Sequence, residues 1–212
     1  MDGSRHFVKP GFIEVYCGAM KSGKTRELLH RLDQFSYLEG VEVLLVKHGA
    51  DTRSKGVYTR AGKELPCIAV QTASDILPYV KEHHRVIAID EAQFFDETLI
   101  DVILALTKHR RHVLVAGLEM NYRAEPFGIM PLIMCHATLI HKQHAICEIP
   151  GCNNIATLPQ RIKNGKPAHY DEPLVVIDGE ERYEARCVHH HVVPGKPQTS
   201  LPVVNNTLKE FY

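Results

Sequence analysis

Residues 12–25 have the sequence Phe12-Ile13-Glu14-Val15-Tyr16-Cys17-Gly18-Ala19-Met20-Lys21-Ser22-Gly23-Lys24-Thr25. The first six residues are mostly apolar and predict a buried strand, and the last eight match the pattern G-x-x-x-x-G-K-[ST] without a gap. Leu28, Leu29 and Leu32 then recur at helical spacing. A strand before this pattern and a helix after it favour a phosphate-binding loop over a glycine-rich turn that only connects two elements.

A phosphate-binding loop implies a nucleotide. Successive backbone N–H groups and the helix N-terminus attract phosphate oxygens. Lys24 is expected to reach the β- and γ-phosphates of ATP, and the Thr25 hydroxyl to contribute to a Mg²⁺ site. The expected nucleotide-binding residues of the loop are Gly18, Ala19, Met20, Lys21, Ser22, Gly23, Lys24 and Thr25.

Short apolar runs alternate with helical patterns over the next 120 residues or so. Strands are expected at residues 41–46, 68–70, 86–90 and 113–117, and helices at residues 74–83 (capped by Ser74), 99–106 and 131–136. This alternation predicts an α/β fold with a parallel P-loop sheet, RecA-like, covered by helices on both faces. After a strand near residues 137–141, we place the end of this domain at residue 142, so that it spans 11–142.

Two carboxylates follow the apolar run Val86–Ile89. Asp90 occupies the strand end at which P-loop proteins hold Mg²⁺. Glu91 would point the other way if the strand continued, so it is available to accept a proton from a substrate hydroxyl. The alternative for both residues is capping of a following helix. The stretch Asp90-Glu91-Ala92-Gln93 also suggests a helicase, but the domain is too short for the two motor domains that a helicase needs.

The composition excludes several classes of protein. The chain has 212 residues and balances 25 Lys+Arg against 25 Asp+Glu, which argues against binding to nucleic acid through bulk charge. Its apolar runs are far shorter than the ~18 residues of a membrane span. Residues 1–7 lack the apolar core of a secretory signal. We therefore expect a cytoplasmic protein with reduced cysteines and no nucleic-acid or membrane partner.

After residue 142 the composition changes, and Pro, Gly and Cys become frequent. Cys147 and Cys152 form one pair with a Pro-Gly turn between them, and Cys187 begins a second pair with a nearby histidine. Two such pairs joined by a β-ribbon predict a closed Zn²⁺ site in a small domain, 143–192, followed by a tail, 193–212. The C-x-x-H spacing favours His190 as fourth ligand over its neighbours His189 and His191. The alternative is buried thiols with surface histidines, and the other cysteines (Cys17, Cys67 and Cys135) are expected to lie in the core.

Residues 11–191 taken together resemble the type II thymidine kinases, a family with a P-loop domain and a zinc "lasso" domain. The resemblance rests on six pieces in order: Gly18–Thr25, Asp51-Thr52-Arg53, Asp90–Phe95, Gly117-Leu118, Pro126-Phe127-Gly128 and the cysteine module. It implies transfer of the ATP γ-phosphate to the 5′-hydroxyl of thymidine, with deoxyuridine as a further possible acceptor, in a homotetramer. For that tetramer we expect the helix at residues 99–106 and the strand near Val113 to supply contacts between subunits.

The resemblance also implies roles for individual residues. Glu91 corresponds to the general base, and Cys147, Cys152, Cys187 and His190 correspond to the zinc ligands. Nucleotide binding would extend to Asp51, Arg53, Asp90 and Gln93. The nucleoside would contact Met20, Phe94, Leu118, Tyr122, Phe127, Val176 and Tyr183.

Some positions differ from the family's pattern, and rival functions follow from them. Lys21 stands where an apolar residue is usual, Glu119 where Asp is usual, and Pro159 where many members have a Thr near the thymine edge. Proline has no N–H to donate. A catalytically weak, regulatory nucleotide-binding protein is therefore the alternative, and a generic ATPase with a macromolecular partner is a third reading.

Overall fold

The fold centres on one six-stranded sheet. The computed structural model describes residues 7–50, 57–58, 64–175 and 182–197. Its sheet has the strand order β5-β2-β6-β7-β1-β8, and every neighbouring pair is parallel. The strands are β1 (Ile13–Gly18), β2 (Glu42–His48), β5 (Cys67–Val70), β6 (His84–Asp90), β7 (His112–Gly117) and β8 (Leu139–Gln143). The expected parallel α/β sheet is confirmed.

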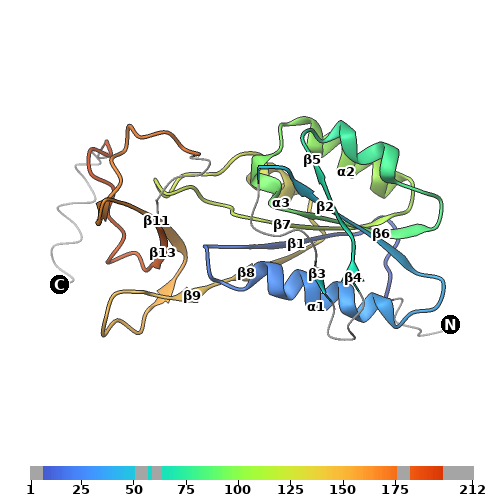
Figure 1. Ribbon diagram of the computed structural model, residues 1–212, viewed down its shortest axis with the longest axis horizontal. Coiled ribbons are helices and arrows are strands. Elements are labelled where there is room, and N and C mark those ends of the chain that lie inside the picture. The colour runs from blue at the N-terminus through green and yellow to red at the C-terminus, as the bar shows by residue number, and fades with distance from the viewer. Residues whose placement is uncertain (1–6, 51–56, 59–63, 176–181, 198–212) are drawn as a thin grey trace.

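Helices cover both faces of this sheet, as the sequence predicts (Figure 1). They are α1 (Lys24–Ser36), α2 (Thr98–Lys108) and α3 (Met130–His136), with 3₁₀ turns η1 (Ser74–Tyr79) and η2 (Ala92–Phe94). Helix α1 packs Leu28, Leu32 and Phe35 on one face, against alternate strand residues such as Leu114. Helices α2 and α3 cover the other face. Because successive strand residues point to opposite sides, an apolar run is buried on both faces.

Two expected features of this domain are wrong. The helix expected at residues 74–83 is the shorter 3₁₀ turn η1, in which Ala73, not Ser74, precedes the first turn. Pro78 lies inside it and lacks the N–H that a longer helix needs. Cys135 is exposed on α3 rather than in the core, whereas Cys17 is buried and Cys67 is partly buried.

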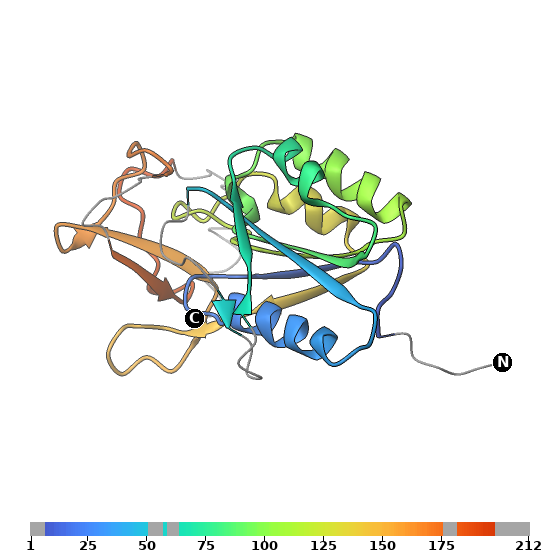
Figure 2. The ribbon, with the colours of Figure 1, turned by 45° about the vertical axis from the view of Figure 1, so that its right-hand side comes forward.

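The residues after β8 form small antiparallel sheets. One pairs β9 (Ala145–Ile146) with β10 (Ile155–Ala156), and the other has the order β12 (Lys166–Pro167), β11 (Leu158–Lys163), β13 (Arg182–Arg186). A further short pair, β3 (Val57–Tyr58) with β4 (Glu64–Leu65), precedes β5. Figures 1 and 2 show β11 and β13 beyond the carboxyl ends of the parallel strands, the edge at which open α/β sheets bind ligands.

The described start of the predicted tail is folded back on the molecule. The Pro194 carbonyl accepts a hydrogen bond from the Tyr170 backbone N–H at 2.8 Å. Lys196 Nζ donates to the Arg123 carbonyl. Among the described residues, no helix is long and apolar enough to cross a membrane.

Candidate functional site

The phosphate-binding loop joins β1 to α1. Gly18 ends β1, and α1 begins at Lys24 directly after Gly23. Lys21 adopts a positive φ of 63° at the top of the loop. Two polar side chains of the loop, Ser22 and Lys24, are buried. The loop thus has the strand–loop–helix context that the sequence predicts.

The Ser22 hydroxyl supports the presence of a ligand in this loop. Its Oγ atom is buried and has no hydrogen-bond partner within the described parts of the chain. A buried polar atom without a partner loses its hydration with no compensation. A phosphate oxygen in the loop would restore the missing bond, so the residues present fit a nucleotide.

Asp90 lies beside this loop at the end of β6. The pKa of Asp90 is raised to about 6: burial and, to a lesser degree, the neighbouring Glu91 carboxylate raise it, and the Glu91 N–H, Lys24 and the Thr25 hydroxyl oppose the shift. The Glu91 N–H donates to Asp90 Oδ1 at 2.8 Å. A carboxylate whose pKa is raised by burial is stabilised in its charged form by an added cation, and Thr25 and Asp90 are oxygen donors of the kind that Mg²⁺ prefers.

Glu91 takes an unusual backbone conformation, φ 54° and ψ 41°, where β6 turns into η2. Non-glycine residues rarely adopt this left-handed region. Although Glu91 precedes the η2 turn, its side chain makes no capping hydrogen bond, so the capping alternative does not explain it. Instead its buried carboxylate accepts a hydrogen bond from Gln93 Nε2, with 2.5 Å between Nε2 and Oε2.

Several aromatic and apolar side chains predicted to bind a nucleoside follow the same sheet edge. The rings of Phe94 and Phe127 meet edge to face with centroids 6.0 Å apart. Leu118, which follows β7, donates its backbone N–H to Gln93 Oε1 at 2.9 Å. Met20 lies in the loop after β1, and Tyr183 lies in β13 opposite Arg161. All five side chains that the sequence singled out here are partly exposed: Met20, Phe94, Leu118, Phe127 and Tyr183.

Tyr122 is instead almost fully buried, with 2% of its surface exposed. Its hydroxyl lies 3.0, 3.2 and 2.7 Å from the carbonyl oxygens of His169, Tyr170 and Glu172. The buried Arg161 guanidinium lies over its ring, 5.0 Å from the centroid. Tyr122 therefore anchors residues 169–172 to the P-loop domain.

Three predicted site residues lie outside the described part of the chain: Asp51, Arg53 and Val176.

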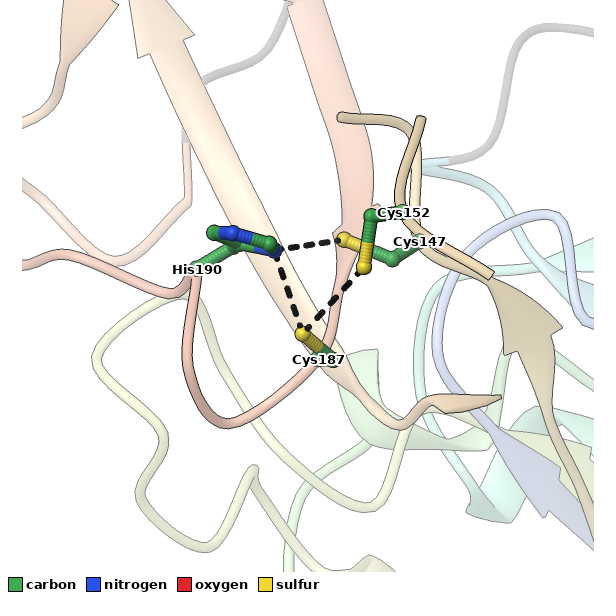
Figure 3. Close-up of side chains that lie close together, drawn as sticks. All are labelled: Cys147, Cys152, Cys187 and His190. Atoms are coloured by element: carbon green, nitrogen blue, oxygen red, sulfur yellow. Dashed lines mark hydrogen bonds between the residues drawn. The ribbon is translucent and has the colours of Figure 1, made fainter. Parts of the chain in front are cut away.

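The predicted metal ligands come together in one cluster (Figure 3). Ligand atoms of Cys147, Cys152, Cys187 and His190 all lie within 4.8 Å of one another. The Cys152 and Cys187 sulfurs are 3.9 Å apart, and His190 Nδ1 is 3.3 Å from the Cys187 sulfur and 3.6 Å from the Cys147 sulfur. A tetrahedral Zn²⁺ with Zn–S bonds of about 2.3 Å has S–S edges of roughly 3.8 Å. The four residues fit a zinc ion.

Local hydrogen bonds lower the pKa of one thiol in this cluster. Burial alone would raise the pKa of Cys147, but backbone N–H groups of Cys187 and Ile149 and the His190 side chain lower it to about 6. The wide Cys147–Cys152 spacing is closed by a turn in which the Cys152 N–H donates to the Ile149 carbonyl at 3.0 Å. Thiolates are the form in which cysteine binds metal.

The neighbouring histidines are engaged differently. His189 is exposed, and His191 Nε2 lies 3.0 Å from the Tyr122 carbonyl and 3.2 Å from the Pro159 carbonyl. Since carbonyls only accept, Nε2 of His191 carries the proton, and burial lowers its pKa. The sequence did not indicate this hydrogen bond between residues 143–192, called the zinc module below, and Tyr122. In the sequence the three histidines differ only in their spacing from Cys187.

A second group of potential ligands, Glu42, His83 and His84, lies at the opposite, amino-terminal ends of β2 and β6. His83 Nε2 is 3.5 Å from Glu42 Oε2. However, His84 Nδ1 accepts the Lys81 backbone N–H at 3.0 Å. A metal-binding imidazole donates from its other nitrogen rather than accepting there, so this group does not fit a metal ion.

Lys21 links the phosphate-binding loop to the zinc module. Its Nζ lies 2.6 Å from Oε2 of Glu148, the residue that follows the predicted ligand Cys147. The other oxygen of Glu148 accepts the Ala185 backbone N–H at 2.6 Å. The loop and the metal cluster are thus joined through one carboxylate, a contact that sequence spacing cannot reveal because 127 positions separate the two residues.

Sequence comparisons with known proteins point to one family. Residues 11–191 match the thymidine kinase family. A thymidine kinase of Coprothermobacter proteolyticus is 44% identical over 191 residues, which cover 89% of this chain and 94% of that protein. Among solved structures, the Legionella pneumophila ATPase DotB aligns with 60% of this chain and 34% of its own, with a TM-score of 0.38 and 13% identity.

Proposed function

This chain belongs to the thymidine kinase family, and we propose that it transfers the γ-phosphate of ATP to the 5′-hydroxyl of thymidine, with deoxyuridine as a second acceptor. One observation carries the proposal: Asp90 and Glu91 follow one another at the end of β6, beside Lys24 and Thr25 of the phosphate-binding loop. Phosphoryl transfer to a hydroxyl needs a phosphate cradle, a cation site and a base, and these residues supply all three.

Nucleotide binding is assigned to Gly18–Thr25. The backbone N–H groups of the loop and the amino end of α1 would hold the phosphates, and Ser22 Oγ would donate to one of their oxygens. Lys24 would neutralise charge on the transferred group. Asp51 and Arg53 are proposed to act near the phosphates on the strength of the resemblance alone.

Asp90 and Thr25 are proposed to hold Mg²⁺. When bound, Mg²⁺ supplies charge neutralisation on the phosphate oxygens. The residues themselves supply oxygen donors, one of which is a carboxylate whose burial makes an added cation favourable.

Glu91 is proposed as the general base. Its left-handed backbone directs the carboxylate away from the run of the strand, and Gln93 holds one of its oxygens. A carboxylate placed in this way accepts the proton of the 5′-hydroxyl as that oxygen bonds to phosphorus. The bond that breaks is the one between the γ-phosphorus and the bridging oxygen, and ADP leaves with that oxygen.

The nucleoside is proposed to lie against the aromatic side chains at the same edge. Phe94 and Phe127 would enclose the base together with Met20, Leu118 and Tyr183. Tyr122 would contribute by fixing residues 169–172 of the lasso. Val176 is assigned to this group by the resemblance.

Cys147, Cys152, Cys187 and His190 are proposed to bind one structural Zn²⁺, which closes a tetrahedral site without an open position for chemistry. We also propose that the P-loop domain spans residues 11–142 and the zinc domain residues 143–192, and that the enzyme is cytoplasmic and homotetrameric.

A regulatory, catalytically weak protein is not favoured. Such a protein has no need to keep Lys24, Thr25, Asp90 and Glu91 together, as they are here.

A panel of nucleosides with MgATP tests the proposed function. Thymidine should raise the midpoint of thermal unfolding more than cytidine or guanosine do, since specific binding stabilises the folded state. The same mixtures should yield thymidine 5′-monophosphate and ADP in equal amounts. ADP formation that does not depend on a nucleoside would support a generic ATPase, and nucleotide binding without any product would support the regulatory protein.

A further inference from the structure

Gln93 is the most completely enclosed polar side chain beside Glu91, with 3% of its surface exposed. The sequence assigned it to nucleotide binding. In the structure, its amide lies between two groups of the protein: Nε2 donates to Glu91 Oε2 at 2.5 Å, and Oε1 accepts the Leu118 backbone N–H at 2.9 Å. One side chain therefore connects the end of β6 with the end of β7.

The orientation of this amide is determined by its partners. The Leu118 N–H can only donate, so it must face the amide oxygen. The amide nitrogen then faces the Glu91 carboxylate, which accepts. A flipped amide would set oxygen against carboxylate and N–H against N–H, and would lose both bonds. Gln93 can thus hold Glu91 in only one way.

Two glycines provide the space that Gln93 occupies. A Cβ atom at Gly117 would lie 2.7 Å from Gln93 Oε1, and a Cβ atom at Gly128 would lie 2.3 Å from the Gln93 carbonyl oxygen. Gly128 also has a φ of 52°, which disfavours other residues there. The end of β7 and the loop before α3 thus pack closely against Gln93.

We propose that Gln93 is a positioning residue that acts through Glu91 and not through the nucleotide. Its amide holds Oε2 and so orients the carboxylate toward the nucleoside hydroxyl. This matters because Glu91 sits on a left-handed turn, and a base must be held in a productive orientation to act. The inference rests on the proposed function, in which Glu91 is the base.

A double-mutant cycle tests this role. Gln93→Met keeps the length of the side chain and removes both amide bonds. With wild-type Glu91, it should lower kcat by about 10–100-fold, the cost of a misplaced catalytic group. The KM values for ATP and thymidine should change by less than about threefold. In a Glu91→Gln background, which has already lost the base, Gln93→Met should lower kcat by less than about twofold.

Gln160→Met is the matched control. Gln160 is equally buried, at 2%, and its amide also makes a donor and an acceptor bond, both to the backbone of Val192. This control should lower thermal stability while leaving the kcat for thymidine within about twofold of wild type.

The outcomes separate the inference from the proposed function. Equal kcat losses from Gln93→Met in both backgrounds, or a loss confined to ATP affinity, would overturn the positioning role and return Gln93 to the nucleotide. Wild-type enzyme that fails to phosphorylate thymidine would overturn the proposed function itself. Gln93→Met protein that binds ATP normally and turns over at the wild-type rate would overturn the inference alone.

Discussion

The pKa values of two carboxylates in the central sheet are shifted in opposite directions. Burial raises the pKa of Asp90 to about 6 at the carboxyl end of β6. Burial also opposes ionisation of Glu14 in β1, but the neighbouring His112 and Arg31 side chains outweigh it and lower the pKa of Glu14 to about 2. Burial thus outweighs the opposing charge of Lys24 at Asp90, whereas the neighbouring side chains outweigh burial at Glu14.

Glu14 is therefore expected to stabilise the fold in a pH-dependent way. Arg31 Nη2 lies 3.1 Å and His112 Nε2 3.2 Å from Glu14 Oε1, and the Tyr16 hydroxyl donates to Oε2 at 3.0 Å. Because the folded pKa is depressed from 4.5 to about 2, the contribution is complete above about pH 4.5 and is lost as the pH falls toward 2. The shift corresponds to about 3 kcal/mol.

Urea unfolding of Glu14→Gln and wild type between pH 3 and 7 measures this contribution. The difference in unfolding free energy should be largest near neutral pH and shrink below pH 4.5 or so. The exposed Glu39→Gln serves as control and should show no such trend. A difference that stays constant down to pH 3 would contradict the assignment.

The sequence predicted where the two site carboxylates lie but not how they are held. Val86–Glu91 predicted an acidic strand end, and Asp90 lies there. The bond from Gln93 to Glu91 was not predictable, since Gln93 is oriented by Leu118 and packs against Gly128, which come close to it only in the folded sheet. Glu14 gave no signal, because its partners lie on α1 and β7.

At the scale of elements, the described residues of the zinc module have almost no core of their own. Its buried cluster consists of Cys147, Ala156, Ala185 and Cys187, and two of these four residues are proposed ligands. Metal coordination must therefore replace much of the hydrophobic burial that stabilises larger units. The β-pairs β9–β10 and β11–β13 bring the ligands together, but they enclose little apolar surface.

Zinc removal should accordingly loosen this module before the parallel sheet. Purified protein is expected to contain one zinc per chain, Cys187→Ser to lose it, and His189→Ala, at an exposed neighbour, to keep it. Metal analysis with limited proteolysis measures both effects, and chelated protein should be cut first within residues 143–192. Full zinc content in Cys187→Ser would contradict the ligand set.

The ion pair Lys21–Glu148 should couple this module weakly to the phosphate-binding loop. Their side chains are 53% and 30% exposed, so solvent screening limits the pair to roughly 0.2–1 kcal/mol. A cycle of Lys21→Met and Glu148→Gln, which keeps an acceptor for the Ala185 N–H, should give that coupling in unfolding free energy at low salt. It should decline at high salt. Coupling that is absent at low salt would show that the two elements are energetically independent.

At the scale of the whole molecule, the sequence predicted a parallel sheet because each strand that is buried on both faces is a continuous run of apolar residues. Contacts between copies were less predictable. The resemblance implies a homotetramer, for which the helix at residues 99–106 and the strand near Val113 were expected to supply contacts. That expectation is wrong for the strand, since β7 lies inside the sheet with Val113 fully buried. Helix α2 does expose Leu104.

The central claim is that this molecule phosphorylates thymidine with Glu91 as base. Steady-state kinetics of Glu91→Gln with thymidine and MgATP, combined with an ATP titration, tests it most directly. The variant keeps the shape of the side chain and loses its basicity, so kcat should fall by about 10²–10⁴-fold with ATP affinity unchanged. Glu97→Gln, at an exposed position nearby, should behave as wild type. Near-normal turnover in Glu91→Gln would contradict the account.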